Sequence, residues 1–223
     1  MKTKTWGCIV ITILLISIAL VFFFSFYIGT SGDSDAKTSE EYTISTIKTT
    51  NDVVHKPVSV ERQVYDTLVE FGISPAGACG ILANAKAESD LCPNNLENFY
   101  NRKFAISDVE YTNLADKREI DFVHDAAGYG LWQFTYYSFK QVLFDMARDN
   151  GTSVSDVRTQ VETLIEILKT PEFSKLFRFL KETNSPENAA KEFMLVFERP
   201  ANQSESAIST RSVFATEFYK IFN

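Results

Sequence analysis

Apolar side chains recur at helical spacing along most of the chain after residue 58. Ser59 is placed to cap one helix, which Gly72 ends, and Ser74 with Pro75 begins a second. The same recurrence predicts further helices over residues 139–147, 157–168, 173–180, 186–197 and 214–222. The first two stripes are Val60, Val64, Leu68 and Phe71, then Ala78, Ile81, Leu82 and Ala85. The sequence therefore predicts a mostly helical domain.

Two stretches depart from this pattern. Residues 93–127 are polar and mixed, without a clear period. Gly128-Tyr129-Gly130 then introduces a short aromatic run, residues 131–137, with strand or turn character. The fold class predicted is all-α with a minor β or turn segment, and functional residues are expected on these irregular segments.

A separate apolar run lies near the start of the chain. Residues 7–28 carry no charge over 22 positions, and a helix of that length spans roughly 33 Å, enough for a bilayer core. The run is longer than the apolar region of a signal peptide and lacks a small-residue cleavage site, so we expect an uncleaved transmembrane anchor. Lys2 and Lys4 precede it and acidic residues follow it. This asymmetry predicts a single-pass protein of the cell membrane with a cytoplasmic tip, residues 1–6, and the remainder outside.

Composition separates a linker from a globular domain. Residues 29–58 are rich in Ser, Thr and charged side chains and read as a flexible linker, whereas residues 59–223 form the predicted domain. The domain holds 17 basic and 24 acidic side chains, so the whole net charge of −7 resides there. This charge makes a nucleic-acid partner improbable. The hydrophobic content of 45% excludes a disordered chain.

Glu88 is the residue whose position suggests chemistry. It follows Ile81 by seven positions, an offset of about 700°, which is within roughly 20° of two full helical turns. Its carboxyl group is therefore predicted on the apolar stripe, at the helix end where the dipole disfavours negative charge. Both effects favour the protonated form that a general acid requires at neutral pH. A helix-end glutamate that reaches solvent is the alternative.

Several short motifs occur in order along the domain. They are Ala87-Glu88-Ser89-Asp90, then Gly128-Tyr129-Gly130-Leu131-Trp132-Gln133-Phe134-Thr135, and Phe197-Glu198-Arg199-Pro200 followed by Arg211 and Tyr219. The first two resemble the Glu-Ser and Gly-Leu-x-Gln pair of lysozyme-like muramidases. The whole set, from about Val60 to Tyr219, resembles the phage tail lysozyme family, including its membrane-anchored members from conjugative elements of Gram-positive bacteria.

The resemblance implies a lysozyme-like helical domain that cleaves the β-1,4 bond between N-acetylmuramic acid and N-acetylglucosamine in peptidoglycan. Glu88 would protonate the glycosidic oxygen, and the loop around Gly130 would face it across a cleft. The substrate-binding candidates are Ser89, Tyr129, Gly130, Gln133, Thr135 and Tyr136. The glycines permit close backbone approach, Gln133 offers a donor and an acceptor, and aromatic faces can stack on sugars. Trp132 and Phe134 favour a core position instead.

The resemblance also implies a cellular setting. Peptidoglycan glycan strands are the expected partner, the membrane is contacted through the anchor, and a secretion or conjugation apparatus is a further possible partner. The linker, rather than charge, would then keep the enzyme near glycan within reach of the membrane. No cofactor and no metal ion is expected.

A second carboxylate is harder to assign. Glycosidases pair the acid with another carboxyl group at about 5 to 9.5 Å, depending on whether they retain or invert configuration. Asp125, just before the glycine loop, is the first candidate, and Asp90, Asp116 and Asp121 are others. If none reaches the cleft, a lytic transglycosylase becomes the better assignment. Glu198 and Arg199, at a helix end, are interpreted as structural.

Three rival readings remain open at this stage. A cysteine endopeptidase would use Cys79 near a helix start with His124, although the helical pattern does not suit that architecture. A zinc enzyme is disfavoured because the chain has only two histidines. A wall-binding scaffold without catalysis is the third. A disulfide between Cys79 and Cys92 is not expected, because roughly 15 Å of helix separates them.

Overall fold

The computed structural model describes residues 57–223, which form a helical domain. Its helices are α2 (Val60–Glu70), α3 (Pro75–Ser89), α4 (Asn98–Phe104), α5 (Asp108–Asp116), α6 (Tyr137–Asn150), α7 (Val157–Leu168), α8 (Ser174–Glu182), α9 (Pro186–Phe193), the π-helix η1 (Met194–Glu198) and α10 (Glu205–Phe222). Within these residues there is no named strand, and a single antiparallel bridge joins Leu96 to Tyr129. The predicted mostly helical fold is therefore confirmed, and the aromatic run after Gly130 forms turns rather than a strand.

Helices α2 and α3 begin where the sequence signals indicated. The Ser59 and Ser74 side chains cap α2 and α3 by accepting hydrogen bonds from backbone N–H groups three residues later. Gly72 follows α2 with a φ of +81°, a conformation that favours glycine. Pro75 occupies the first turn of α3. Local chemistry therefore sets the bounds of the helices that precede the site.

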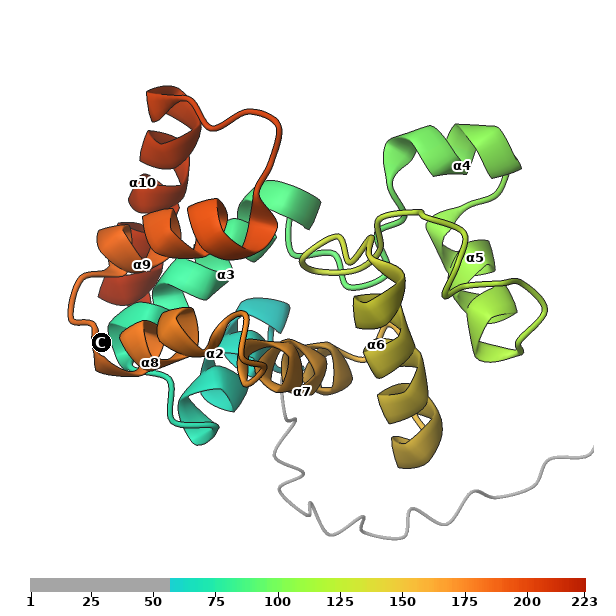
Figure 1. The fold of residues 1–223 in the computed structure, drawn as a ribbon, viewed down its shortest axis with the longest axis horizontal. Helices are drawn as coiled ribbons and strands as arrows, with labels where there is room; N and C mark the ends of the chain where they lie inside the picture. Colours follow the sequence, from blue (N-terminus) through green and yellow to red (C-terminus); the bar gives the residue numbers. More distant parts are fainter. Residues whose placement is uncertain (1–56) are drawn as a thin grey trace, which may run out of the picture. The chain divides into compact units, whose positions relative to one another are not determined.

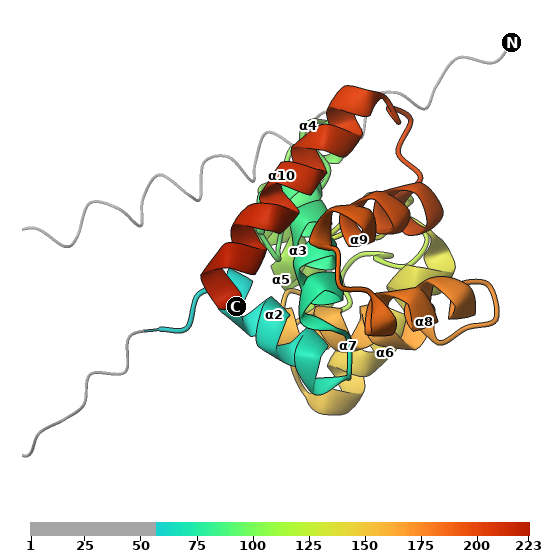
Figure 2. The ribbon, with the colours of Figure 1, turned by 90° about the vertical axis from the view of Figure 1, so that its left-hand side faces the viewer.

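Helix α3 is the centre of the domain (Figures 1 and 2), packed against α2, α8, α9 and α10. Ten consecutive residues of this helix, 76–85, are buried. A Cβ atom on Gly80 would lie 2.4 Å from Cβ of Ala189, so α9 can approach α3 this closely only because residue 80 is glycine. The middle of α3 is thus held closely against α9, while residues 86–88 near its end reach the domain surface.

Two short helices were not predicted. Helices α4 and α5 have only 7 and 9 residues, and both lie in the stretch 93–127 that looked irregular. Helix α4 has no buried residue, and α5 buries only Tyr111, Thr112 and Ala115. Such short elements do not repeat an apolar stripe often enough to be recognised. With α6 they form the side of the domain opposite α8, α9 and α10 (Figure 1).

The helix predicted over residues 186–197 changes character before its end. The α-helical hydrogen bonding of α9 stops at Phe193 and continues as the π-helix η1 to Glu198. Arg199 then adopts a left-handed conformation, with φ of 47°, and ends the element. The last helix also starts earlier than predicted, at Glu205 behind the cap Ser204. The wider turn of η1 alters the direction of the side chains around Glu198.

No helix within residues 57–223 combines the length and apolar character that crossing a bilayer requires. The predicted anchor, residues 7–28, the tip, residues 1–6, and nearly all of the linker, residues 29–58, lie outside the described residues.

Candidate active site

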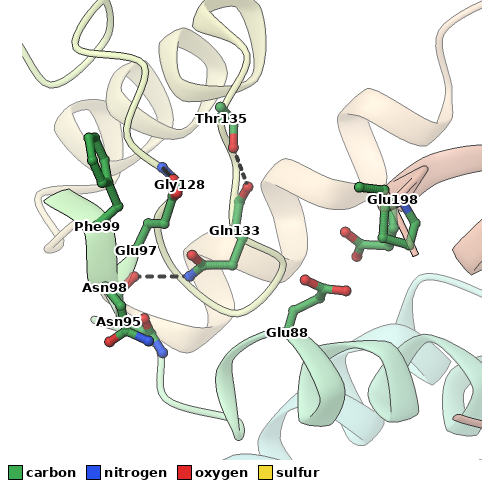
Figure 3. A pocket seen from close by; sticks show the side chains of 11 residues that line it. Glu88, Asn95, Glu97, Asn98, Phe99, Gly128, Gln133, Thr135 and Glu198 are labelled. Atoms are coloured by element: carbon green, nitrogen blue, oxygen red, sulfur yellow. Dashed lines mark hydrogen bonds between the residues drawn. The ribbon is translucent and has the colours of Figure 1, made fainter. Parts of the chain in front are cut away.

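A cavity of about 590 Å³ lies at the C-terminal end of α3 (Figure 3). Its walls come from four segments: the end of α3, residues 95–99, the loop 128–135, and residues 198–201 at the end of η1 and directly after it. The lining residues are Glu88, Asn95, Glu97, Asn98, Phe99, Gly128, Gln133, Thr135, Glu198, Pro200 and Ala201. Glu88 and the glycine loop therefore border one cavity, although 40 residues separate Glu88 from Gly128.

Glu88 is partly buried, with its side chain 21% exposed, and it forms an ion pair with Arg211 from α10. Arg211 is itself only 10% exposed, and its Nε donates to Oδ1 of Asn84 at 2.9 Å. The amide of Asn84 donates in turn to the carbonyls of Gly80 and Ala190. These contacts fix the guanidinium, and through it the Glu88 carboxylate, relative to α3 and α9.

Glu198 is the second carboxyl group that lines the cavity beside Glu88. In Figure 3 the two carboxyl groups point toward one another. The residue as a whole is partly exposed, but its Oε1 atom is buried and has no hydrogen-bond partner. Burial raises the pKa of the Glu198 carboxyl well above its usual range; the Glu88 charge raises it further, and Arg211 opposes both.

Sequence reasoning missed Glu198 as a site residue. Its neighbour Arg199 has the structural contacts that were expected of the pair, because its guanidinium bonds the Val196 carbonyl and Glu172. Glu198 instead faces the cavity. The available signal was its position directly after the core residue Phe197, where a charged side chain is uncommon.

The glycine loop, residues 128–135, is hydrogen-bonded to residues 95–97, directly before α4. Nε2 of Gln133 donates to the carbonyls of Asn95 and Gly130, and the N–H of Gly130 also donates to the Asn95 carbonyl. The N–H of Gly128 donates to Oε2 of Glu97 at 3.2 Å. Thr135 donates to the Gln133 carbonyl. The loop backbone therefore forms a fixed wall, from which Oε1 of Gln133 remains as an acceptor.

Ser89 connects α3 to that wall. Its hydroxyl is buried and bonds the carbonyls of Ala85 and Leu131, each at 3.0 Å. Ser89, a substrate-binding candidate from the sequence, does not line the cavity; its hydroxyl instead joins the end of α3 to the loop backbone. Gly130, with φ of +79°, has the Gln160 amide 2.6 Å from where a Cβ would lie. Only glycine fits there.

The aromatic side chains that are exposed near the cavity differ in part from those predicted. Tyr129 is completely buried and its hydroxyl is bonded to Thr112 at 2.6 Å, so no face of its ring is free for a sugar. Trp132 and Phe134 belong to the core, as expected. Tyr136 is 67% exposed and lines a small recess next to Glu198. Phe99, which sequence reasoning overlooked, is 54% exposed and lines the main cavity.

Asp125 lies in a different place from the one expected of a second carboxylate. It contacts Lys140 and Tyr111 and lines a separate, mostly apolar cavity of about 390 Å³. Lys140 is fully buried; burial lowers the pKa of its ammonium, while Asp125 raises it. The carboxylate of Asp125 is therefore held as the counter-ion of a buried lysine. Asp90, Asp116 and Asp121 do not line the cavity of Glu88 either.

The thiol of Cys79 is not arranged for catalysis. It is completely buried, and burial raises its pKa to about 12, so the thiolate is not formed at neutral pH. His124 pairs instead with Asp121 at the surface. Cys79 and Cys92 are both free, in agreement with the expectation that they are not bridged. In the described part of the chain, no group of three or more His, Cys, Asp or Glu is arranged to hold a metal ion.

Four of the seven non-glycine residues with positive φ in the described part of the chain lie near the Glu88 cavity. Asp90 and Leu91, directly after α3, have φ of 54° and 61°, and Gln133 and Arg199 both have φ of 47°. Non-glycine residues with positive φ are uncommon, and they concentrate where surrounding structure forces a functional geometry. Here they turn the chain on three sides of the cavity.

A helical domain with a helix-end glutamate facing a fixed glycine loop defines a lysozyme-like protein. A model of the phage tail lysozyme family matches residues 59–222, and the chain belongs to that family. A comparison with curated proteins gives no match. Family membership confirms the resemblance carried by the motifs and makes the protein a lysozyme-like enzyme of peptidoglycan degradation.

Proposed function

We propose that this protein cleaves the β-1,4 bond between N-acetylmuramic acid and N-acetylglucosamine, with Glu88 as general acid. The observation that carries this proposal is the position of the Glu88 carboxyl group: it lies in the wall of a 590 Å³ cavity, opposite the loop of Gly128 and Gln133. A carboxyl group in such a partly buried position can deliver a proton to a glycosidic oxygen without competition from bulk water.

The chemistry requires one proton and one stabilised cation. Glu88 gives its proton to the glycosidic oxygen, the bond from that oxygen to the anomeric carbon breaks, and the electron pair leaves with the oxygen. The sugar becomes oxocarbenium-like, and the carboxylates of Glu88 and Glu198 stabilise its positive charge. Water then adds to the anomeric carbon and returns a proton to the carboxyl pair. Glu198 thus has the role of the second carboxylate, for which Asp125 was the first candidate from the sequence.

Substrate contacts are proposed for the other walls. Asn95 and Asn98 line the cavity with side-chain amides that suit sugar hydroxyl and N-acetyl groups. Phe99 offers an exposed ring for stacking, and Tyr136 a second one at the adjacent recess. Gln133 contributes an acceptor and Thr135 lines the wall beside it.

We also propose that the enzyme acts close to the outer face of the cell membrane. The support is the uncharged run of residues 7–28, with lysines before it and acids after it. A soluble fragment from Ser59 onward that opened walls as effectively as the full chain at the same low concentration would contradict this part of the proposal.

Mass spectrometry of released muropeptides tests the reaction itself. Digestion of purified peptidoglycan is expected to give fragments that end in reducing N-acetylmuramic acid. Anhydro ends would identify a lytic transglycosylase, in which the sugar's own hydroxyl replaces water. Cleavage of stem peptides would contradict the proposal, and binding without any product would favour a wall-binding scaffold.

A further inference from the structure

The buried oxygen of Glu198 has no role in folding that the structure accounts for. Oε1 has no hydrogen-bond donor, although it lies beside the catalytic cavity where Arg211 is close enough to pair with Glu88. A buried acceptor without a partner is unfavourable by about 1 to 3 kcal/mol, and more if it is charged. Placing a second negative charge next to Glu88 would add to that penalty.

The surrounding charges do not remove this penalty. Arg211, from α10, bonds Glu88 and Asn84 rather than Glu198. Glu97 lines the same cavity and adds a further acid. Arg199, on the same segment as Glu198, bonds Glu172 and the Val196 carbonyl. Glu198 therefore faces the acid Glu88 and one arginine, Arg211, and that arginine is already paired.

We propose that Glu88 and Glu198 form a carboxyl pair that shares one proton in the free enzyme. Glu198 carries this proton before the reaction. This inference rests on the proposed function of Glu88. Arg211 stabilises the charge on Glu88, so the proton resides on Glu198, whose surroundings offer no donor. The pair then carries one negative charge, which the single guanidinium balances.

A proton held on Glu198 explains how Glu88 can act as an acid although it is paired with Arg211. When a glycan fills the cavity, the proton moves from Glu198 to the Glu88 carboxylate and from there to the glycosidic oxygen. Both carboxylates are then negative beside the oxocarbenium-like sugar. The attacking water loses a proton to Glu88, which returns it to Glu198, so each turnover consumes one water and leaves the pair unchanged. Glu198 thus supplies its proton through Glu88 and, once ionised, adds its negative charge beside the sugar.

The pH dependence of kcat/KM tests this pairing. Without Glu198 there is no second carboxyl group to hold the proton, and the Glu88 carboxylate keeps its ion pair with Arg211. Glu198→Gln is therefore expected to shift the alkaline limb of the profile to lower pH by about one unit or more. Glu198→Asp should recover part of the shift. Glu217→Gln, an exposed glutamate on the helix of Arg211, is the matched control and should leave the profile in place.

A titration without turnover separates this inference from the proposed function. In the purified protein labelled with ¹³C at glutamate carboxyl carbons, one resonance is expected to titrate well above the usual range of a glutamate and to be absent in Glu198→Gln. If Glu88→Gln keeps full activity, the proposed function fails, whatever the titration gives. If Glu88→Gln is inactive while Glu198 titrates in the usual range of a glutamate, the pairing is wrong and the role of Glu88 stands. The same holds if Glu198→Gln only lowers the rate and leaves the pH profile in place.

Discussion

Arg211 and Glu88 are 123 positions apart in the sequence, and their ion pair joins α10 to the end of α3. Because Arg211 is 10% exposed and Glu88 21%, both charges are largely removed from water. The pair therefore positions the proposed acid, and it leaves the neighbouring Glu198 without a cation of its own.

Removal of the arginine should destabilise the domain. Arg211→Met leaves the Glu88 carboxylate and the Asn84 oxygen without their partner, and we expect the free energy of unfolding to fall by about 2 to 4 kcal/mol. Urea unfolding followed by circular dichroism measures this. Lys220→Met, at an exposed position of the same helix, is the control and should change stability by no more than about 0.5 kcal/mol. Equal effects of the two variants would show that the pair does not stabilise the fold.

Loss of the proposed acid should abolish turnover with little effect on folding. Glu88→Gln is isosteric but cannot donate a carboxylic proton, so the rate of muropeptide release should fall by about 10²- to 10⁴-fold. Sedimentation with intact peptidoglycan is expected to show binding close to that of the wild type. Glu217→Gln should retain its rate. A Glu88→Gln enzyme within a few-fold of the wild type would remove Glu88 from the mechanism.

The exposed ring of Phe99 should contribute to glycan binding rather than to stability. Phe99→Ala is expected to weaken the binding of soluble glycan fragments by about tenfold, the scale of one aromatic stacking contact. Tyr137→Ala is a suitable control, since Tyr137 is 67% exposed and is absent from the cavity lining. Calorimetric titration measures both variants. Similar affinities for the two would exclude Phe99 from the binding surface.

Stability should decrease as pH rises above about 4.5, because of Glu198. Its pKa is raised in the folded state, so the folded protein binds more protons than the unfolded chain between the two pKa values. The stabilising proton is fully present below the unfolded value and is lost as pH rises through the folded one, at about 1.4 kcal/mol per pH unit in that window. Unfolding in urea at pH 4 to 8 measures the slope. Glu198→Gln should flatten it and Glu217→Gln should not; a slope that survives in Glu198→Gln belongs to another group.

The two free cysteines of the domain should differ in reactivity. Cys79 is fully buried with a pKa of about 12, whereas Cys92 is partly exposed. Iodoacetamide at pH 8 is therefore expected to label Cys92 and spare Cys79 in the native protein, as peptide mass spectrometry would report. Cys79→Ala should retain peptidoglycan cleavage. If that variant were inactive yet folded, the cysteine endopeptidase would have to be reconsidered.

Structural features that depend on a few neighbouring residues could be predicted from the sequence. Ser59, Ser74 and Pro75 mark helix starts through side-chain caps and a fixed φ, which depend on three or four neighbouring residues. The position of Glu88 near the end of a buried helix follows from the same periodicity. Helices α4 and α5 were not predicted because they are short and polar, so apolar residues do not recur at helical spacing often enough to be recognised.

The partners of Glu88 could not be predicted in the same way. Arg211 and Glu198 reach it from helices more than 100 positions later, and only the packing of α3 against α9 and α10 brings them together. Tertiary packing likewise pairs Asp125 with the buried Lys140 and places Tyr129 in the core. By itself the sequence determined the longer helices, the family and the proposed acid, since these depend on local spacing and motifs. The tertiary structure alone decided which charges surround that acid, because electrostatic neighbours are set by distance in space.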